Sequence, residues 1–323
     1  METPAKIYDV GIIGAGAAGL TASIYASRYQ LSNIVFGTLW GGEIANASVI
    51  ENWPGDRSVT GAELTKRMVD HARHLNAEIR PDRIIKVIKN GRHNFDLVTE
   101  AGDKVAVKEV ILSTGTRRRH LNIPGEDKLA GRGVSYCATC DAPFFREKIT
   151  AVIGGGDAAM TAALHVALFS PEVYLVVRRD DLGGEPIWRE KVRANPKIKI
   201  LFQTEVTEIL GDQTVTGIKL SRPYGGQDSL SLSGVFVEIG ADPDVVLAED
   251  LGVELDSAGY IKVSEEMRTN LDCVYASGDA TTGNAHLDQI ISAAAEGGLA
   301  ARSIFWHLTQ EKSKPGFLKR LLS

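Results

Sequence analysis

Two stretches of the chain repeat the same hydrophobic pattern about 140 residues apart. Residues 8–13 (YDVGII) are an apolar run, GAGAAG follows, and LTASIYASRY then has the composition of a helix. Later, residues 149–153 (ITAVI) precede GGGDAA and MTAALHVALF, and residues 173–177 (VYLVV) form the next apolar run. Short apolar runs bounded by glycine are typical of buried strands. The pattern therefore predicts two strand–glycine turn–helix units of the dinucleotide-binding kind.

The remaining apolar runs place the second unit inside the first. Strands are predicted at residues 109–115 (EVILSTG), 234–239 (GVFVEI) and 272–279 (DCVYASGD), and a long helix from about 288 to 308. We expect an α/β fold of two Rossmann-like dinucleotide-binding domains, three-layer ββα in architecture, with the second inserted into the first. The outer domain is expected to comprise residues 1–117 and 247–323, and the inserted domain residues 118–246.

Composition narrows the class of protein further. The 323 residues are 44% hydrophobic and 24% charged, as in ordinary soluble proteins, and the net charge of −5 gives no reason to expect a nucleic-acid partner. No segment approaches the roughly 18 apolar residues that span a membrane. The N-terminal METPAKIYDV has no signal-peptide core. We expect a cytoplasmic protein without a membrane partner.

The first glycine turn, GAGAAG, has the spacing of a dinucleotide-binding loop. Gly14 permits the tight turn, Gly16 lets the backbone approach a pyrophosphate, and Gly19 lets helix and strand pack closely. Its place near the N-terminus is typical of many FAD proteins. An acid that would hold the ribose is absent at the end of the next strand, because none occurs before Glu43. We expect the ribose to be held in another way.

The second glycine turn contains Gly154 and Gly156 and has the same logic. The strand after it ends in Arg178 and Arg179, and arginine at this position suits a 2′-phosphate, whereas an acid would suit a free hydroxyl. These residues indicate NADP(H) rather than NAD(H). The alternative is a solvated basic pair on a domain that was inherited without its ligand.

Cys137 and Cys140 lie three positions apart and are followed at once by Asp141. A structural zinc site would need about four ligands, and only Cys273 remains, in an apolar strand and with no HxxxH pair in the chain. A buried pair of inert thiols is a second alternative. A redox-active disulfide accounts best for the spacing, with Asp141 passing a proton to the leaving thiolate. We expect no metal, and Cys273 to pack as a small core residue.

Taken together, these motifs resemble the low-molecular-weight thioredoxin reductases over nearly the whole chain. The resemblance rests on a set of motifs in a fixed order: GAGAAG at 14–19, GG at 41–42, ENWPG at 51–55, STG at 113–115, IPGE at 123–126, CATCD at 137–141, GGGDAA at 154–159, RRD at 178–180, and SGD at 277–279 with Gln289 beyond.

The resemblance implies an outer FAD domain, an inserted pyridine-nucleotide domain that carries the cysteine pair, a rotation between the two, and a homodimer. In the family pattern Cys140 is the thiol nearest the flavin, Cys137 attacks the disulfide of thioredoxin or a similar partner, and Asp141 is the acid/base. The residues that would contact FAD are Gly14, Gly16, Gly19, Gly41, Gly42, Asn52, Thr114, Gly115, Gly278, Asp279 and Gln289.

Several positions depart from the family pattern. Val177 and Gly183 stand where the family has a histidine and an arginine for the 2′-phosphate, and Asp288 stands where it tends to have an arginine. Each lost charge-assisted contact is worth roughly 1.5–3 kcal/mol. The helix after the second glycine turn begins with the apolar stretch at 160–163, where acids are usual.

The C-terminal segment 309–323 is longer than the family pattern. It is either a frayed tail or a docking segment, in which an apolar face is formed by Phe317, Leu318, Leu321 and Leu322.

These departures leave the electron donor open. We favour a flavin-dependent thioredoxin reductase with weak or lost NADPH use and a donor such as ferredoxin, as in the pyridine-nucleotide-independent branch of the family. A conventional NADPH-dependent thioredoxin reductase is the alternative. A ferredoxin–NADP reductase would not need the cysteine pair, and a non-catalytic flavin-binding protein would not need an intact CATCD.

Overall fold

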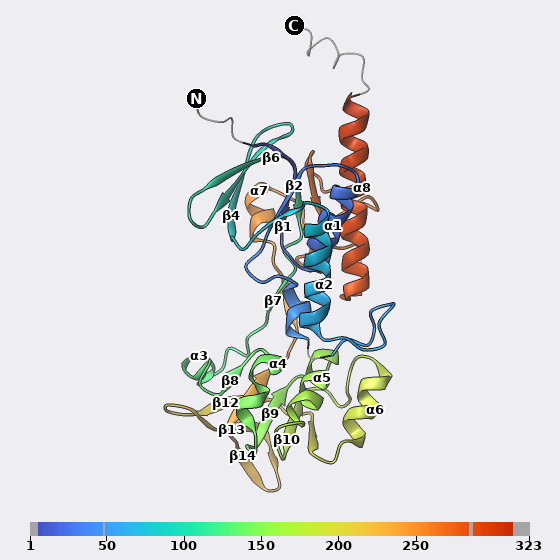
Figure 1. The fold of residues 1–323 in the computed structure, drawn as a ribbon. Coiled ribbons are helices and arrows are strands. Elements are labelled where there is room, and N and C mark those ends of the chain that lie inside the picture. The colour runs from blue at the N-terminus through green and yellow to red at the C-terminus, as the bar shows by residue number, and fades with distance from the viewer. Residues whose placement is uncertain (1–5, 48, 284–286, 313–323) are drawn as a thin grey trace. The chain divides into compact units, whose positions relative to one another are not determined.

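The computed structural model describes residues 6–47, 49–283 and 287–312. The chain forms two compact units (Figure 1). Unit 1 comprises Met1–Thr116 and Pro243–Ser323, and unit 2 comprises Arg117–Asp242. The chain passes between them through β7 (Thr116–Arg118) and β16 (Ala241–Pro243), which pair with each other.

The core of unit 1 is a seven-stranded sheet in the order β3-β2-β1-β6-β5-β4, with β17 also paired to β6. Its strands are β1 (Tyr8–Ile13), β2 (Asn33–Phe36), β3 (Glu78–Arg80), β4 (Ile84–Gly91), β5 (Asn94–Thr99), β6 (Lys104–Leu112) and β17 (Val274–Ala276). The strands β3, β2, β1, β6 and β17 are parallel, and the hairpin of β4 and β5 adds to β6 in antiparallel fashion. The strands β1, β2 and β17 are short and mainly apolar because both of their faces are buried.

Helices cover this sheet. They are α1 (Ala17–Arg28), η1 (Gly42–Asn46), α2 (Gly61–His74), α7 (Val246–Leu251) and α8 (Ile290–Lys312). The helices α1 and α8 pack along each other (Figure 1). Thr60 caps α2, because its side chain accepts a hydrogen bond of 3.2 Å from the Glu63 N–H.

Unit 2 contains a parallel sheet in the order β11-β10-β9-β15-β8 and an antiparallel sheet in the order β12-β13-β14. Its strands are β8 (Val134–Ser135), β9 (Thr150–Ile153), β10 (Val173–Val177), β11 (Ile198–Phe202), β12 (Val206–Gly211), β13 (Val215–Tyr224), β14 (Gln227–Ser231) and β15 (Gly234–Val237). Its helices are α3 (Glu126–Leu129), α4 (Ala138–Asp141), η2 (Ala142–Phe145), α5 (Asp157–Val166) and α6 (Pro186–Ala194).

The predicted α/β fold with two Rossmann-like dinucleotide-binding units is confirmed. Element bounds differ in places from those expected. The strand expected at 272–279 is only Val274–Ala276, because Cys273 is left-handed and a glycine turn follows the strand. The last helix extends to Lys312. Neither glycine nor proline occurs between Leu308 and Pro315 to end it earlier. The four residues of the proposed apolar tail face, at positions 317–322, lie outside the described part.

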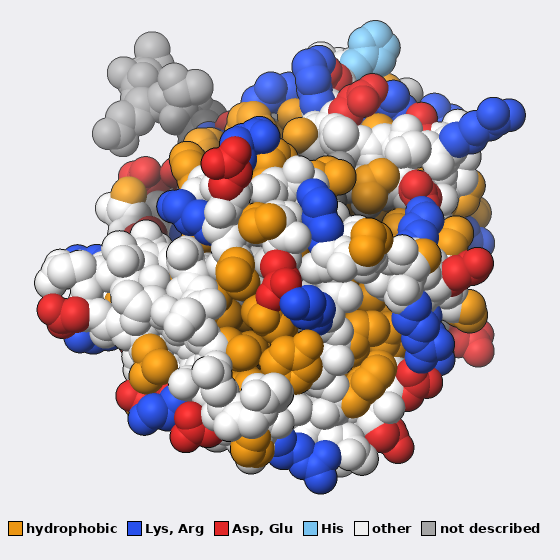
Figure 2. Space-filling view, turned by 90° about the horizontal axis from the view of Figure 1, so that it is seen from below, with side chains coloured by type: hydrophobic (Ala, Val, Ile, Leu, Met, Phe, Trp, Pro, Cys, Tyr) orange, Lys and Arg blue, Asp and Glu red, His pale blue; other side chains and the backbone are white. Residues whose placement is uncertain are grey.

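The molecular surface mixes charges of both signs. On the face drawn in Figure 2, hydrophobic side chains gather near the middle, with Lys, Arg, Asp and Glu interspersed around them. Among the described residues, no helix combines the length and apolar character that crossing a membrane requires.

Candidate active site: a disulfide and two glycine turns

Cys137 and Cys140 form a disulfide with a Cα–Cα distance of 5.3 Å. The pair begins α4, directly after the short strand β8, so that Cys137 is the N-cap of the helical turn. The backbone N–H of Cys140 donates to Cys137 Sγ at 3.2 Å. A hydrogen bond to sulfur favours its thiolate form, so the backbone would stabilise negative charge on Cys137 after reduction.

Asp141 belongs to the same helical turn as the two cysteines. Its backbone N–H donates to the Cys137 carbonyl at 3.1 Å, which closes the turn. Its side chain is half-buried. The structure thus places the three residues that the sequence singled out for disulfide chemistry in one helical turn.

The glycine turn of unit 1 connects β1 to α1. Gly14 has a φ of +118°, and a Cβ there would lie 1.9 Å from the Ser113 carbonyl oxygen, so only glycine fits. A Cβ at Gly16 would meet only the Gly41 carbonyl oxygen, at 3.8 Å. Gly16 is also the N-cap of α1 and supplies no side-chain cap, so the first N–H groups of the helix remain available to an anion.

The loop after β2 forms a second wall of this turn. Gly41 donates its N–H to the Ala15 carbonyl at 2.7 Å and forms a bridge with Gly16. Thr65, on α2, lies against Gly41, and its hydroxyl oxygen is buried without a hydrogen-bond partner among the described residues. Thr65 was not predicted as a site residue, because its polar position on an amphipathic helix gives no signal of its own. Gly42, the next predicted residue, is left-handed and lies over Gly16.

Other predicted residues of unit 1 come together from distant parts of the sequence. Asn52 donates through Nδ2 to Gln289 Oε1 at 2.8 Å. The Thr114 hydroxyl donates to the Asp244 carbonyl at 2.5 Å. Gly115 is left-handed and has no atom within 4 Å of its Cβ position, which leaves open space beside the end of β6.

Asp279 follows Gly278 directly after β17 and has an unsatisfied carboxylate oxygen. Its Oδ1 is buried without a hydrogen-bond partner among the described residues. Burial, together with the negative charges of Asp288, Glu296 and Glu43, raises the pKa of Asp279 to about 7. The structure therefore holds a carboxyl group that lacks a donor.

Glu296, on α8, fixes the loop that carries Asp279. Its Oε2 accepts from the Gly278 N–H at 2.7 Å and from the Thr281 hydroxyl at 2.9 Å. Sequence reasoning missed this residue. The available signal was a single acid inside the small apolar stretch SAAAEGGLAA.

These features of unit 1 fit FAD, the cofactor expected from the sequence. The open position at Gly16 and the uncapped start of α1 suit a diphosphate. The unsatisfied carboxylate of Asp279 suits a hydroxyl donor, as on a ribityl chain. The end of β2 carries no acid that could hold the ribose, and the fit described here does not depend on one.

The glycine turn of unit 2 repeats the geometry of the first. Gly154 has a φ of +139° and packs against the Glu238 carbonyl, while Gly156 caps α5 and has open space at its Cβ position. A Cβ at Gly155 would lie 2.7 Å from Val177 Cγ1, so buried Val177 packs beneath the turn. The turn itself is intact.

The two arginines after β10 have different surroundings. The Arg178 side chain is 82% exposed, and its Nε lies 3.8 Å from Glu205 Oε1. Asp181 binds Arg193 at 2.6 Å. The Arg179 guanidinium occupies the space into which a side chain at Gly183 would project, since a Cβ there would lie 2.2 Å from its terminal nitrogen.

Three features together define a class of oxidoreductase: the flavin-type cradle of unit 1, and the second glycine turn and the disulfide of unit 2. Residues 8–297 match the family described as pyridine nucleotide-disulphide oxidoreductase, and the chain belongs to this family. Within it, the chain is a member of the low-molecular-weight thioredoxin reductases.

The relatives and neighbours support this assignment. A thioredoxin reductase of Mycolicibacterium smegmatis is 44% identical over 86% of this chain and 90% of that protein. The crystal structure of Lactococcus lactis thioredoxin reductase (FR conformation) has a TM-score of 0.88 at 33% identity and covers 94% of this chain and 99% of that chain. A ferredoxin-flavin thioredoxin reductase from Clostridium acetobutylicum has a TM-score of 0.50 at 32% identity, with 94% and 99% covered.

Proposed function

We propose that this protein reduces the disulfide of thioredoxin or of a similar small protein, and that electrons pass from FAD in unit 1 through the Cys137–Cys140 pair. The observation that carries this proposal is the disulfide itself, followed directly by a carboxylate, in a chain that also has a flavin-type cradle. The relatives are themselves named thioredoxin reductases.

FAD bound in unit 1 would, once reduced by the electron donor, supply the two electrons that open the disulfide. Two electrons and two protons convert Cys137–Cys140 into two thiols, and we assign the proton exchange with the departing sulfur to Asp141, which directly follows Cys140. In the family pattern, the Cys137 thiolate then attacks a partner disulfide, and a partner cysteine leaves as a thiolate. Cys140 next attacks the Cys137 sulfur, which releases the partner as a dithiol and restores the Cys137–Cys140 bond.

An exposed aromatic side chain lies close to the pair in sequence and offers an anchor for the partner. Phe144 is 72% exposed, three residues after Asp141, whereas its neighbour Phe145 is buried. A large exposed apolar side chain beside a reactive group is typical of a docking surface. We assign Phe144 to contact with the partner protein.

The electron donor is the finer part of the proposal. We propose weak NADPH use, with ferredoxin or a similar carrier as donor. The support is local: Val177 is buried, Gly183 offers no side chain, and Arg178 lies 3.8 Å from Glu205. Loss of two charge-assisted contacts at roughly 1.5–3 kcal/mol each would lower NADPH affinity by at least on the order of 100-fold. A solved neighbour with a TM-score of 0.50 is named a ferredoxin-flavin thioredoxin reductase.

A conventional NADPH-dependent reductase is the second candidate. It is favoured by the intact glycine turn at Gly154 and Gly156, by the exposed Arg178, and by the Arg179 guanidinium beside Gly183. The two candidates share every step from the flavin onward and differ only in how the flavin is reduced.

We also propose that the protein is a homodimer. Tyr25 on α1 and Leu299 and Trp306 on α8 are large apolar side chains that are 40–47% exposed. Two helices that pack along each other present these side chains, as a subunit interface would require. Light scattering after gel filtration gives the mass of the assembly.

A donor-independent experiment tests the proposed function. The flavin is reduced anaerobically with a limiting amount of dithionite and then mixed with oxidised thioredoxin, and flavin reoxidation is followed together with new thioredoxin thiols. The proposal requires two thioredoxin thiols for each flavin reoxidised. Flavin that stays reduced in the presence of oxidised thioredoxin would refute it and would favour a non-catalytic flavoprotein.

A further inference from the structure

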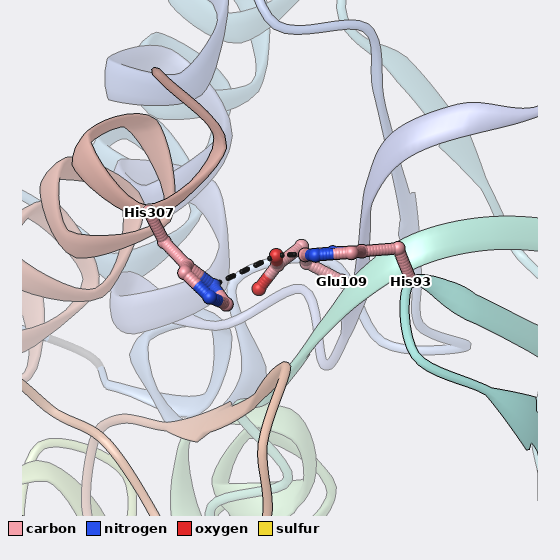
Figure 3. Close-up of side chains that lie close together, drawn as sticks. All are labelled: His93, Glu109 and His307. Carbon is pink, nitrogen blue, oxygen red and sulfur yellow. Dashed lines mark ion pairs between the residues drawn. The ribbon is translucent and has the colours of Figure 1, made fainter. Parts of the chain in front are cut away.

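Three polar side chains from distant parts of the sequence meet in unit 1. His93 lies in the turn between β4 and β5, Glu109 lies on β6, and His307 lies on α8. Figure 3 shows both imidazole rings pointing at the carboxylate. His93 Nδ1 is 2.9 Å and His307 Nδ1 is 3.0 Å from the same oxygen, Glu109 Oε1. Both rings thus present a metal-ligating atom to one point.

Glu109 is fully buried at this point. Its side chain is 0% exposed, and its Oε2 has no hydrogen-bond partner among the described residues. A buried carboxylate is costly unless charge and hydrogen bonds compensate it. A divalent cation among these ligands would supply the compensation.

Cys273 completes the set. Its Sγ lies 3.5 Å from His93 Nδ1, and it also lies within 4.8 Å of a ligating atom of His307. Burial raises the pKa of the Cys273 thiol to about 11, and the charge of Glu109 contributes. Without a metal the thiol therefore stays protonated, whereas a coordinated thiol is deprotonated outright.

Three of these atoms lie close enough together to hold one ion, since the ligating atoms of His93, Glu109 and His307 all lie within 4.8 Å of one another. Zinc binds nitrogen and oxygen ligands at about 2.0–2.2 Å and sulfur at about 2.3 Å. Cys273 Sγ lies beside this group, 3.5 Å from His93 Nδ1. Mixed imidazole, thiolate and carboxylate ligands suit zinc rather than magnesium or calcium.

The backbone at two of the four residues is unusual. His93 has a φ of +53° and Cys273 a φ of +67°. Left-handed conformations are uncommon for residues other than glycine and concentrate at functional sites. These conformations aim the imidazole and the thiol at the cluster.

The other nitrogen of His307 faces an ion pair. His307 Nε2 lies 3.3 Å from Arg92 Nη2 and 3.7 Å from Asp272 Oδ1, and Arg92 pairs with Asp272 at 2.9 Å. His307 Nδ1 also lies 3.3 Å from the Tyr275 hydroxyl, so the ring has polar neighbours at both nitrogens.

We propose that His93, Glu109 and His307, with Cys273 as the candidate fourth ligand, form a structural site for zinc or a similar divalent transition-metal ion, which ties α8 to the sheet of unit 1. All four ligands belong to one unit, and none belongs to the flavin cradle or the disulfide. The site therefore stands apart from the proposed electron path.

Cobalt(II) is the probe for this site, because its visible and near-ultraviolet bands report tetrahedral geometry and a sulfur ligand. The purified flavoprotein is kept oxidised, so that Cys137 and Cys140 stay in their disulfide, and the titration is repeated in a background with Cys137→Ser and Cys140→Ser. The test variants are His307→Gln and Cys273→Ser. The matched control is His71→Gln with His74→Gln, which removes two exposed histidines on α2.

We expect one cobalt ion per chain with tetrahedral bands in the wild type and in the control. In His307→Gln the affinity should fall by more than about 100-fold, since loss of an outer-shell partner alone costs 10–100-fold. Cys273→Ser should lose the sulfur-to-cobalt band, and zinc should raise Tm in the wild type but not in His307→Gln. Absence of cobalt and zinc binding in the wild type, or binding that neither test variant changes, would overturn the proposal.

Discussion

The two glycine turns of this chain have the same backbone design but different surroundings. In unit 1, Gly16 opens α1, the turn is flanked by Gly41, and Gly278, next to the unsatisfied Asp279, lies against Ala18 of α1. In unit 2, Gly156 opens α5 in the same way, but the next strand ends in a buried valine, and two arginines follow, of which Arg178 lies near Glu205. The turn therefore defines a place for a diphosphate, whereas the neighbouring segments decide which nucleotide binds and how strongly.

The comparison is tested most directly by making the same substitution in both glycine turns. Gly16 and Gly156 have room for a side chain, so valine at either position should leave the fold intact and fill the space of a diphosphate. Gly16→Val should lower FAD affinity by at least on the order of 100-fold, because several diphosphate contacts are lost. Gly156→Val should leave FAD binding unchanged. Flavin content after purification and circular dichroism measure both effects, and loss of flavin in Gly156→Val would contradict the assignment.

A second substitution separates the unit that holds the cofactor from the unit that holds the disulfide. Cys140→Ser should lower thioredoxin reduction to the level of an enzyme-free control, since no disulfide can form, while flavin content stays normal. Cys273→Ser is the matched control and should keep the activity. If Cys140→Ser still reduced thioredoxin, the role of the pair would be wrong.

The proposed contact between Phe144 and the partner protein can be tested by substitution. Burial of a phenylalanine side chain is worth roughly 1.5–3 kcal/mol, so Phe144→Ala should raise the KM for thioredoxin about 10-fold. The rate with a small aromatic disulfide should not change. Leu168→Ala removes another side chain that is 69% exposed and serves as the control. An unchanged KM in Phe144→Ala would place the partner elsewhere.

The prediction that unit 2 binds NADPH weakly can be tested by restoring a cation at position 183. Gly183→Arg should improve kcat/KM for NADPH about 10-fold, because one charge-assisted contact is worth roughly 1.5 kcal/mol or more. The flexible Arg179 side chain has to move aside, since it now fills this space. Gly183→Gln keeps the size without the charge. Equal kinetics for both variants would mean that the missing cation does not limit NADPH use.

The smallest effect concerns the unsatisfied carboxyl of unit 1. The pKa of Asp279 is about 7 in the folded protein and has an ordinary value of 3.8, so between these values the folded state holds a proton that the unfolded state has lost. The stability of the FAD-free protein should therefore fall as pH rises from about 4 to 7 and level off above.

Asp279→Asn removes this dependence. Its Tm advantage over the wild type should grow across the same window and shrink when FAD is bound. Asp228→Asn, at an exposed position, is the control. A Tm difference between Asp279→Asn and the wild type that does not vary with pH would contradict the assignment.

Local sequence patterns predicted most of the fold and much of the candidate site. Continuous apolar runs and the glycine spacing located the strands and both turns, because these depend on neighbours in sequence. Residues that act through tertiary contacts were missed. Thr65 and Glu296 sit in ordinary helical patterns and become noticeable only where α2 and α8 meet the glycine loops.

The cluster around Glu109 shows the same limit. Its members are at positions 93, 109, 273 and 307, so no ligand spacing could reveal them, and Cys273 alone predicted a core residue. Cys273 is indeed buried in the core of unit 1, but it also faces His93.

The central proposal is that unit 2 no longer supports efficient use of NADPH because of the residues next to its glycine turn, while unit 1 holds a functional flavin. Anaerobic titration of the flavoprotein with NADPH, followed by flavin absorbance, tests this most directly, with dithionite and reduced ferredoxin titrated in parallel. The account predicts that stoichiometric NADPH leaves the flavin oxidised, whereas dithionite and ferredoxin bleach it. Rapid bleaching at stoichiometric NADPH would contradict the claim and would make this a conventional NADPH-dependent thioredoxin reductase.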